Sequence, residues 1–118
     1  MRLSLFALLF TCTTLFTVAE LRAEEAPEKE ETTGYSLIIK GHTFTPSEIT
    51  IPANKRVKLI IDNQDDSAEE FESHELNREK VIAAKSKGVV LIGPLKPGSY
   101  KFVGEFHEET AKGTIIVK

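Results

Sequence analysis

Sulfur is nearly absent from this sequence. Among its 118 residues there is one cysteine, Cys12, and one methionine, Met1. A disulfide within the chain is therefore excluded, and no disulfide-linked partner is expected for the part that follows Cys12. The same lack removes thiolate and thioether ligands from that part. A metal site there would have to use imidazole nitrogen and carboxylate oxygen.

The signals for nucleic-acid binding and for two common kinds of catalysis are also missing. The chain carries 15 Lys and Arg against 18 Asp and Glu, a net charge of −3, and no basic stripe with interleaved aromatic residues. Nucleic acid is therefore not an expected partner. The sequence has no glycine-rich phosphate loop before a helix and no serine nucleophile elbow, so no self-sufficient catalytic site is visible.

Residues 1–23 predict a secretory signal peptide. Arg2 is followed by an apolar run over residues 3–18 and a small-residue exit at Ala23. The run is short and interrupted by threonines, which suits a signal peptide better than a membrane span. Cleavage after Ala23 is expected, with Ala19 as the second choice and a retained membrane anchor as the alternative. The predicted location is the periplasm.

The remaining chain predicts a short leader and one domain. Residues 24–33 are Glu, Lys, Pro and Thr with hardly an apolar side chain, a composition that cannot bury enough surface to order itself. Residues 34–118 have no internal repeat and room for a single core. We therefore expect a flexible acidic leader over 24–33 and a domain over 34–118.

The domain is predicted to be all-β. Turn signals recur about every ten residues, and no stretch carries a helical period; residues 76–82 would form one helical turn at most. The pattern predicts a Greek-key β-sandwich of about seven or eight short strands. The expected strands are 35–39, 49–51, 57–62, 89–92, 100–103 and 114–117, with weaker ones at 69–73 and 81–82.

Four motifs in order give the domain a family resemblance. They are the stretch 44–51, the strand 57–63, the corner Leu95-x-Pro-Gly-x-Tyr100, and the closing segment from His107 to Gly113. A buried tyrosine at such a corner can donate its hydroxyl back to the turn. Together these motifs resemble the cupredoxins, and the resemblance implies the cupredoxin-like sandwich.

The metal positions depart from the family pattern. A blue-copper centre uses a Cys thiolate, two His and a weak axial ligand, usually Met. By the resemblance, Gly104 stands at the Cys position, Glu69 at the first His and His107 at the second His. The Met position falls near Ala111 or Lys112. The resemblance therefore implies a cupredoxin whose soft site has been rebuilt with carboxylates.

The acidic pattern is similar to one particular group of cupredoxins. Residues 69–73, Glu-Glu-Phe-Glu-Ser, and residues 104–107, Gly-Glu-Phe-His, look like the small periplasmic components of bacterial high-affinity iron uptake systems. That resemblance implies an iron or copper ion as ligand and a membrane iron permease as partner. Whether the protein assists oxidation of ferrous iron stays open, as does a homodimer that completes the site.

Five residues are predicted metal ligands. Glu69 shares strand parity with Phe71, so it would lie at the sandwich end beside His107. Glu105 would share the side of His107 if the loop between them were extended. The candidate ligands are His107, Glu69, Glu105, Glu72 and Glu79.

Other polar residues near these candidates are read as surface. Glu70 and Glu72 point away from Glu69 on the strand, and Glu72 would join the site only through a kink. His42 precedes the Phe44 strand and His74 falls in a turn, so both are weaker candidates. The alternative function is a metal-free interaction module that docks a membrane transport complex.

We expect the protein isolated from its native host to begin near Glu24 and to fractionate with soluble periplasmic proteins. N-terminal sequencing of the purified protein is the measurement. An N-terminus at Met1, or recovery with the inner membrane, would show that residues 1–23 are retained.

Overall fold

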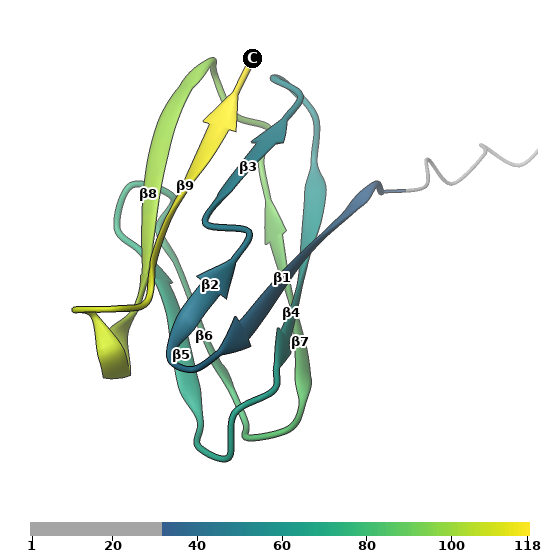
Figure 1. Cartoon of the computed structure of the whole chain (residues 1–118). Coiled ribbons are helices and arrows are strands. Elements are labelled where there is room, and N and C mark those ends of the chain that lie inside the picture. Colours follow the sequence, from purple (N-terminus) through teal and green to yellow (C-terminus); the bar gives the residue numbers. More distant parts are fainter. Residues whose placement is uncertain (1–31) are drawn as a thin grey trace, which may run out of the picture.

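Residues 32–118 are described by a computed structural model; the predicted signal peptide and most of the predicted leader lie outside them. The described residues form nine strands and one 3₁₀ turn, η1 (Figure 1). Their bounds are β1 (Gly34–Lys40), β2 (Thr43–Thr45), β3 (Glu48–Ile51), β4 (Val57–Asn63), β5 (Glu69–Ser73), β6 (Arg78–Ile82), β7 (Lys87–Ile92), β8 (Gly98–Gly104), η1 (Glu105–His107) and β9 (Lys112–Val117). Over this stretch no helix is both long and apolar enough to cross a membrane.

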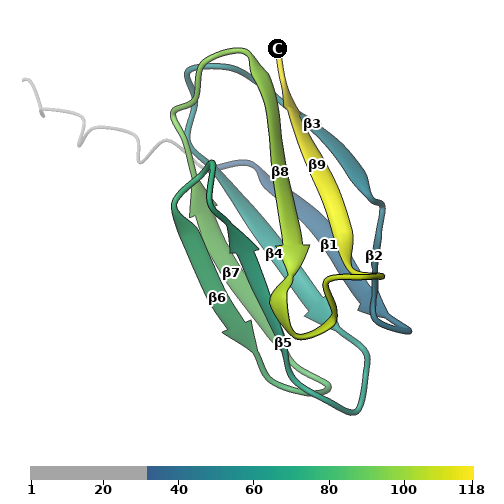
Figure 2. The ribbon, with the colours of Figure 1, turned by 90° about the vertical axis from the view of Figure 1, so that its left-hand side faces the viewer.

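The strands form two sheets packed face to face. One sheet has the order β2-β1-β4-β7 and the other the order β3-β9-β8-β5-β6. Within them β1 pairs with β4 and β3 pairs with β9 in parallel, and the other pairs are antiparallel. Figures 1 and 2 show the two layers from perpendicular directions. The predicted all-β sandwich is confirmed.

The list of expected strands was one short, because it gave no bounds for a separate strand around Phe44, which is β2. β2 has only three residues, Thr-Phe-Thr, with a proline directly after it. Such a segment is too short for an alternating pattern to be visible. The weak strands at 69–73 and 81–82 are real, and the second begins earlier, at Arg78. The stretch for which one helical turn was allowed therefore lies mostly in β6.

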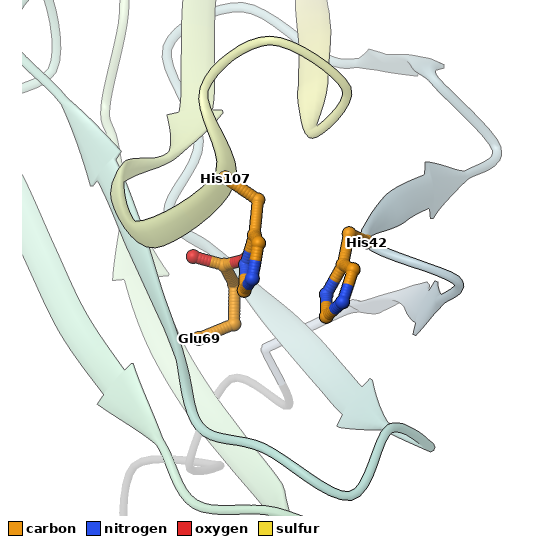
Figure 3. Close-up of side chains that lie close together, drawn as sticks. All are labelled: His42, Glu69 and His107. Atoms are coloured by element: carbon orange, nitrogen blue, oxygen red, sulfur yellow. The ribbon is translucent and has the colours of Figure 1, made fainter.

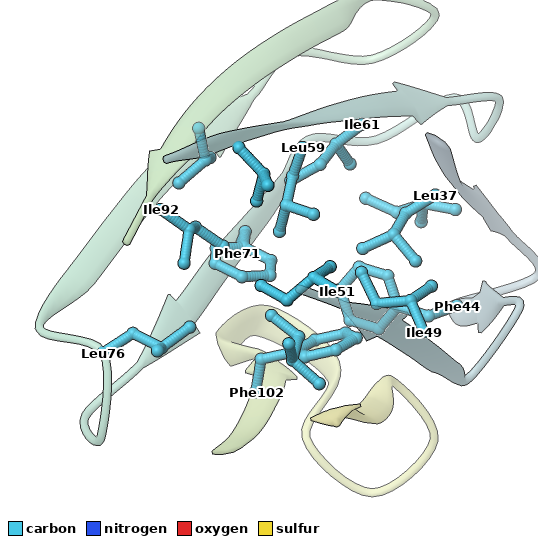
Figure 4. Close-up of a cluster of buried hydrophobic side chains, with 14 of the residues drawn as sticks. Leu37, Phe44, Ile49, Ile51, Leu59, Ile61, Phe71, Leu76, Ile92 and Phe102 are labelled. Atoms are coloured by element: carbon cyan, nitrogen blue, oxygen red, sulfur yellow. The ribbon is translucent and has the colours of Figure 1, made fainter. Parts of the chain in front are cut away.

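The core lies between the sheets and follows the alternation of the strands. On β4, Val57, Leu59 and Ile61 are buried while the residues between them are half-exposed. An aromatic cluster joins the two sheets: the centroid of the Phe102 ring lies 4.9 Å from that of Phe44 and 5.2 Å from that of Phe71 (Figure 4). Burial of these side chains is the main stabilising term of the fold.

The predicted tyrosine corner is present before β8. The Tyr100 hydroxyl donates a hydrogen bond to the Lys96 carbonyl over 2.8 Å, and the ring is half-buried. This bond ties the turn before β8 to the strand itself. It fixes where β8 starts, and thereby where it ends at Gly104.

His42 and His107 lie at the same end of the sandwich, which we call the histidine end. β1, β4 and β8 run toward it, and β5 and β9 start from it, because β1 and β4 are parallel and β5 and β9 are antiparallel to β8. It is the lower end in Figure 1. The turn after β1, the loop after β4 and η1 therefore meet there.

Gly113 leaves room for the Phe102 ring, and its replacement should destabilise the fold. It faces Phe102 across the β8–β9 pair, and a Cβ at residue 113 would overlap the Phe102 ring. Gly113→Ala should therefore lower the free energy of unfolding by about 1–3 kcal/mol, as overpacking does. Urea denaturation measures it.

Gly34→Ala is the matched control for that variant. A Cβ at residue 34 would meet only the ends of two flexible side chains, Ile60 Cδ1 and Lys58 Cε, each at 3.1 Å. Equal destabilisation by the two substitutions would contradict the proposed role of the Phe102 contact.

Candidate metal centre

Three side chains from separate elements converge at the histidine end. His42 lies in the turn between β1 and β2, Glu69 is the first residue of β5, and His107 is the last residue of η1. Each offers a ligand atom, and these atoms lie within 4.8 Å of one another (Figure 3). Two imidazoles and one carboxylate are therefore close enough together to be candidate ligands of one ion.

Glu69 is the buried member of this triad. Its side chain is 2% exposed. Oε1 accepts the backbone N–H groups of Phe106 at 2.9 Å and Glu70 at 3.0 Å, and Oε2 lies 2.6 Å from Nδ1 of His107. A buried carboxylate without partners would be costly. The two N–H donors and the short contact with the imidazole compensate for its burial.

Gly104 provides the space for this carboxyl group. A Cβ at residue 104 would lie 2.7 Å from Cδ of Glu69 and 2.7 Å from Cβ of Ala111. By the family resemblance, this is the position of the copper-binding cysteine, and the Met position lies near Ala111. The side chain of Glu69 and the buried Ala111 thus occupy the volume that any larger residue at 104 would need.

His107 is held by its own loop. Its carbonyl accepts the N–H groups of Thr110 at 3.2 Å and Ala111 at 2.8 Å, and the Gly104 N–H donates to the Ala111 carbonyl over 2.9 Å. The loop between β8 and β9 is closed on itself in this way. The imidazole, 30% exposed, is left at the surface with one nitrogen against Glu69.

His42 stacks on His107. The two ring centroids are 3.6 Å apart and the rings are tilted by only 15° (Figure 3). A metal ion lies close to the plane of a ligating imidazole, at roughly 2.0–2.1 Å from the nitrogen. Two nearly parallel rings cannot both satisfy this for one ion. Shared binding therefore requires one ring to turn, and His42, with a 44% exposed side chain, has the room.

The structure places His42, the weaker candidate by sequence, beside the predicted ligands Glu69 and His107. The residue belongs to a turn that follows β1, and the parallel pairing of β1 with β4 carries this turn to the end where Glu69 begins β5. The sequence holds one relevant signal, Gly41-His42 between two strand-like segments, which suits a tight hairpin turn. Only the sheet topology gives that turn its neighbours.

The other three predicted ligands do not lie at the triad. Glu105 gathers with Glu70 and Glu72, and Glu79 is the β6 partner of Glu72. Glu105 was expected beside His107 in an extended loop, but the segment is a 3₁₀ turn. With three residues per turn, side chains two positions apart point in different directions. Of the five predicted ligands, Glu69 and His107 belong to the triad, Glu72 and Glu105 belong to a separate acidic cluster, and Glu79 belongs to neither.

In the acidic cluster of Glu70, Glu72 and Glu105, the pKa values of two carboxyl groups are raised. Partial burial and then the nearby Glu105 carboxyl raise the pKa of Glu70 above its usual value. A hydrogen bond with Glu105 and then burial raise the pKa of Glu72. The cluster therefore holds protons more readily than free carboxyls do, and it repels itself when ionised.

The donor set of the triad does not fit a blue-copper centre. Residues 32–118 contain neither Cys nor Met, so no thiolate or thioether can be supplied from them. Two imidazoles and one carboxylate with open positions are the ligand set of non-haem Fe(II) sites, and imidazole also suits copper and zinc. The arrangement is chemically competent to hold a divalent cation.

The chain belongs to the family of cupredoxin-like domains, which it matches over residues 5–117. A curated relative is the uncharacterized protein RP394 of Rickettsia prowazekii (strain Madrid E). The two are 46% identical over 81 residues, which cover 69% of this chain and 65% of the relative. The chain thus spans about two thirds of the relative's length.

Solved structures show the same fold at low sequence identity. The metal-binding domain of the Cu(I)-exporting P-type ATPase CopA of Streptococcus pneumoniae D39 is 15% identical, with 72% of this chain and 84% of that chain covered and a TM-score of 0.65. Auracyanin A, a blue copper protein of Chloroflexus aurantiacus, is 13% identical, with 75% of this chain and 100% of that chain covered and a TM-score of 0.65. Amicyanin of Paracoccus versutus is 14% identical, with 75% of this chain and 83% of that chain covered and a TM-score of 0.57.

The acidic cluster predicts a pH-dependent stability. Because the folded-state pKa values of Glu70 and Glu72 are raised, the folded protein binds more protons than the unfolded chain above the ordinary Glu pKa. Stability should therefore fall as pH rises through that window. Glu105→Gln removes the shared neighbour and should raise Tm at pH 7, with the gain vanishing near pH 4.

Thermal unfolding across this pH range tests the cluster. Glu109→Gln, a charge change at an exposed position of the same loop, is the control. A gain in the control as large as in Glu105→Gln would mean that general charge, and not the cluster, sets the effect.

Proposed function

We propose that the protein binds a divalent metal cation, iron or copper, on the periplasmic side of the membrane, as an accessory protein of a metal uptake system. The observation that carries the proposal is the triad: a buried Glu69 carboxylate against His107, with His42 within reach. A buried acid beside two surface imidazoles is the kind of group that a cation would complete.

The charge distribution supports a cation as the ligand. Loops 64–68 and 105–111, at the histidine end, contribute Asp65, Asp66, Glu105, Glu108 and Glu109, while loop 83–86 contributes one lysine, Lys85. Loops 52–56, 74–77 and 93–97, at the opposite end, contribute Lys55, Arg56 and Lys96 against one acid, Glu75. The negative electrostatic potential of these acids at the histidine end raises the local concentration of cations and the rate at which they bind.

Binding displaces a proton. At 2.6 Å, the contact between Nδ1 of His107 and Oε2 of Glu69 holds a proton that a cation shared by the two atoms would replace. Affinity should therefore weaken in acid. Both histidine side chains are partly exposed, so an ion held by them would stay accessible to a partner, which suits transfer. Oxidation of Fe(II) would in addition need an acceptor for the electron.

Affinity alone does not name the cargo. For one nitrogen and oxygen site, Cu(II) binds more tightly than Fe(II) in the general order of divalent metals. The protein should follow this order in vitro whatever it carries in the cell. The proposal of iron rests on the resemblance of residues 69–73 and 104–107 to iron-uptake components. Copper has its support in the copper-binding domains that share the fold.

One observation favours the alternative of a metal-free interaction module. Within residues 32–118 every buried side-chain nitrogen and oxygen has a hydrogen-bond partner. The triad is thus complete as a hydrogen-bonded structure, and the acidic end could instead dock a basic surface of a membrane complex. Metal titration separates the two functions.

Calorimetric titration with Cu(II), and with Fe(II) under anaerobic conditions, tests the proposal. His107→Ala and His42→Ala each remove a nitrogen donor and should weaken binding by more than about 100-fold, beyond the loss typical of outer partners. Glu69→Gln keeps the shape and removes the negative oxygen, so a smaller loss is expected. The Cu(II) form should lack the intense thiolate colour of blue-copper proteins.

Glu109→Gln is the control for these titrations, since it changes charge in the same loop without touching the triad. Binding that survives both histidine substitutions, or a loss in the control equal to that in Glu69→Gln, would contradict the metal site. It would leave the interaction module as the function.

A further inference from the structure

We propose that Asp65 is the positioning residue for the His42 ligand. Its carboxylate holds the backbone of the turn and faces Nδ1 of His42, so that Nδ1 carries the proton and Nε2 is the nitrogen presented to the metal. This inference rests on the proposed function and adds the residue that determines how His42 takes part.

The Asp65 carboxylate accepts two backbone hydrogen bonds from the turn between β1 and β2. Oδ1 of Asp65 accepts the Gly41 N–H over 2.8 Å, and Oδ2 accepts the His42 N–H over 2.9 Å. Both turn residues have positive φ, 60° for Gly41 and 55° for His42. Positive φ at both central residues is the geometry of a tight hairpin turn, and it is uncommon for a residue with a side chain. Asp65 stabilises it from another loop.

The same oxygen lies beside the imidazole. Oδ2 of Asp65 is 3.4 Å from Nδ1 of His42. Both carboxylate oxygens of Asp65 already accept backbone N–H groups of the turn, and a carboxylate can only accept hydrogen bonds. A neutral imidazole carries one proton, and the negative charge of a carboxylate 3.4 Å from Nδ1 favours that proton on Nδ1. The lone pair on Nε2 is then available to an ion once the ring turns out of its stack on His107, as in carboxylate–histidine–metal arrangements.

Asp65 is itself fixed by the fold. Its N–H donates to Oδ1 of Asn63 over 3.1 Å, and its carbonyl accepts the Lys85 N–H over 3.1 Å. Asn63 is fully buried, and its amide donates to the carbonyls of Ser67 at 2.9 Å and Ile82 at 3.1 Å. The carboxylate is therefore in place before any ion arrives.

Thr110 holds the same turn from the other side and provides a matched control. Its hydroxyl donates to the His42 carbonyl over 2.6 Å. Thr110→Val removes a bond to the turn without changing what faces Nδ1. A residue that merely supports the structure should behave as Thr110 does, whereas Asp65 should also control the tautomer.

The test is long-range ¹H–¹⁵N NMR of the metal-free full chain, which reports the tautomer of each histidine, together with Cu(II) titration. Wild type should show His42 with its proton on Nδ1. In Asp65→Asn the amide can direct an N–H at Nδ1, so the proton should move to Nε2 and affinity should fall about 10- to 100-fold. Thr110→Val should keep the wild-type tautomer, and Asp65→Glu should restore it at least in part.

The outcomes separate this inference from the proposed function. A wild-type His42 with its proton on Nε2 would overturn the role of Asp65, even if Asp65→Asn failed to fold. So would an Asp65→Asn variant that keeps the wild-type tautomer. If metal binding still requires His107 and His42 in those cases, the proposed function stands without the inference. If wild type binds no metal, the proposed function and the ligand role of His42 fail together, whatever the tautomer.

Discussion

The histidine end is organised by one buried charge. A carboxylate inside a sandwich is tolerated only where donors surround it, and Glu69 has two backbone N–H groups and an imidazole in that role. Two of these partners, the Phe106 N–H and the His107 imidazole, belong to η1 and fix its position. The Phe106 N–H points inward because η1 bends directly after β8, and His107 reaches Oε2 because that bend continues for one turn. The closing loop takes its shape from the acid it covers.

This dependence explains which features were accessible from sequence. Alternation on β4 and the regular turns were sufficient for the sandwich, because the burial of a strand face is a local pattern. The parity of Glu69 with Phe71 also placed the acid on the inner face. In these cases the side-chain direction follows from the pleat alone.

The features that were missed depend on contacts distant in the chain. His42 adopts a positive φ and takes its neighbours through the β1–β4 pairing and the bonds from Asp65, none of which leaves a pattern near residue 42. Glu105 would share the side of His107 only in an extended loop, and a three-residue 3₁₀ turn has no periodicity from which the sequence could have predicted it. Short turns are specified by what packs on them, and that information lies elsewhere in the sequence.

The close approach of Gly104 to Glu69 has an evolutionary consequence. A Cβ at 104 would lie 2.7 Å from the carboxyl carbon, so a cysteine there collides with the acid already present. An acid appearing at position 69 while 104 still carried a side chain would meet the same collision. Residues in such contact have strongly non-additive effects. A cysteine at 104 and the glutamate at 69 therefore exclude each other in this backbone, and exchange of one site for the other requires both positions to change, together or through a small residue at both.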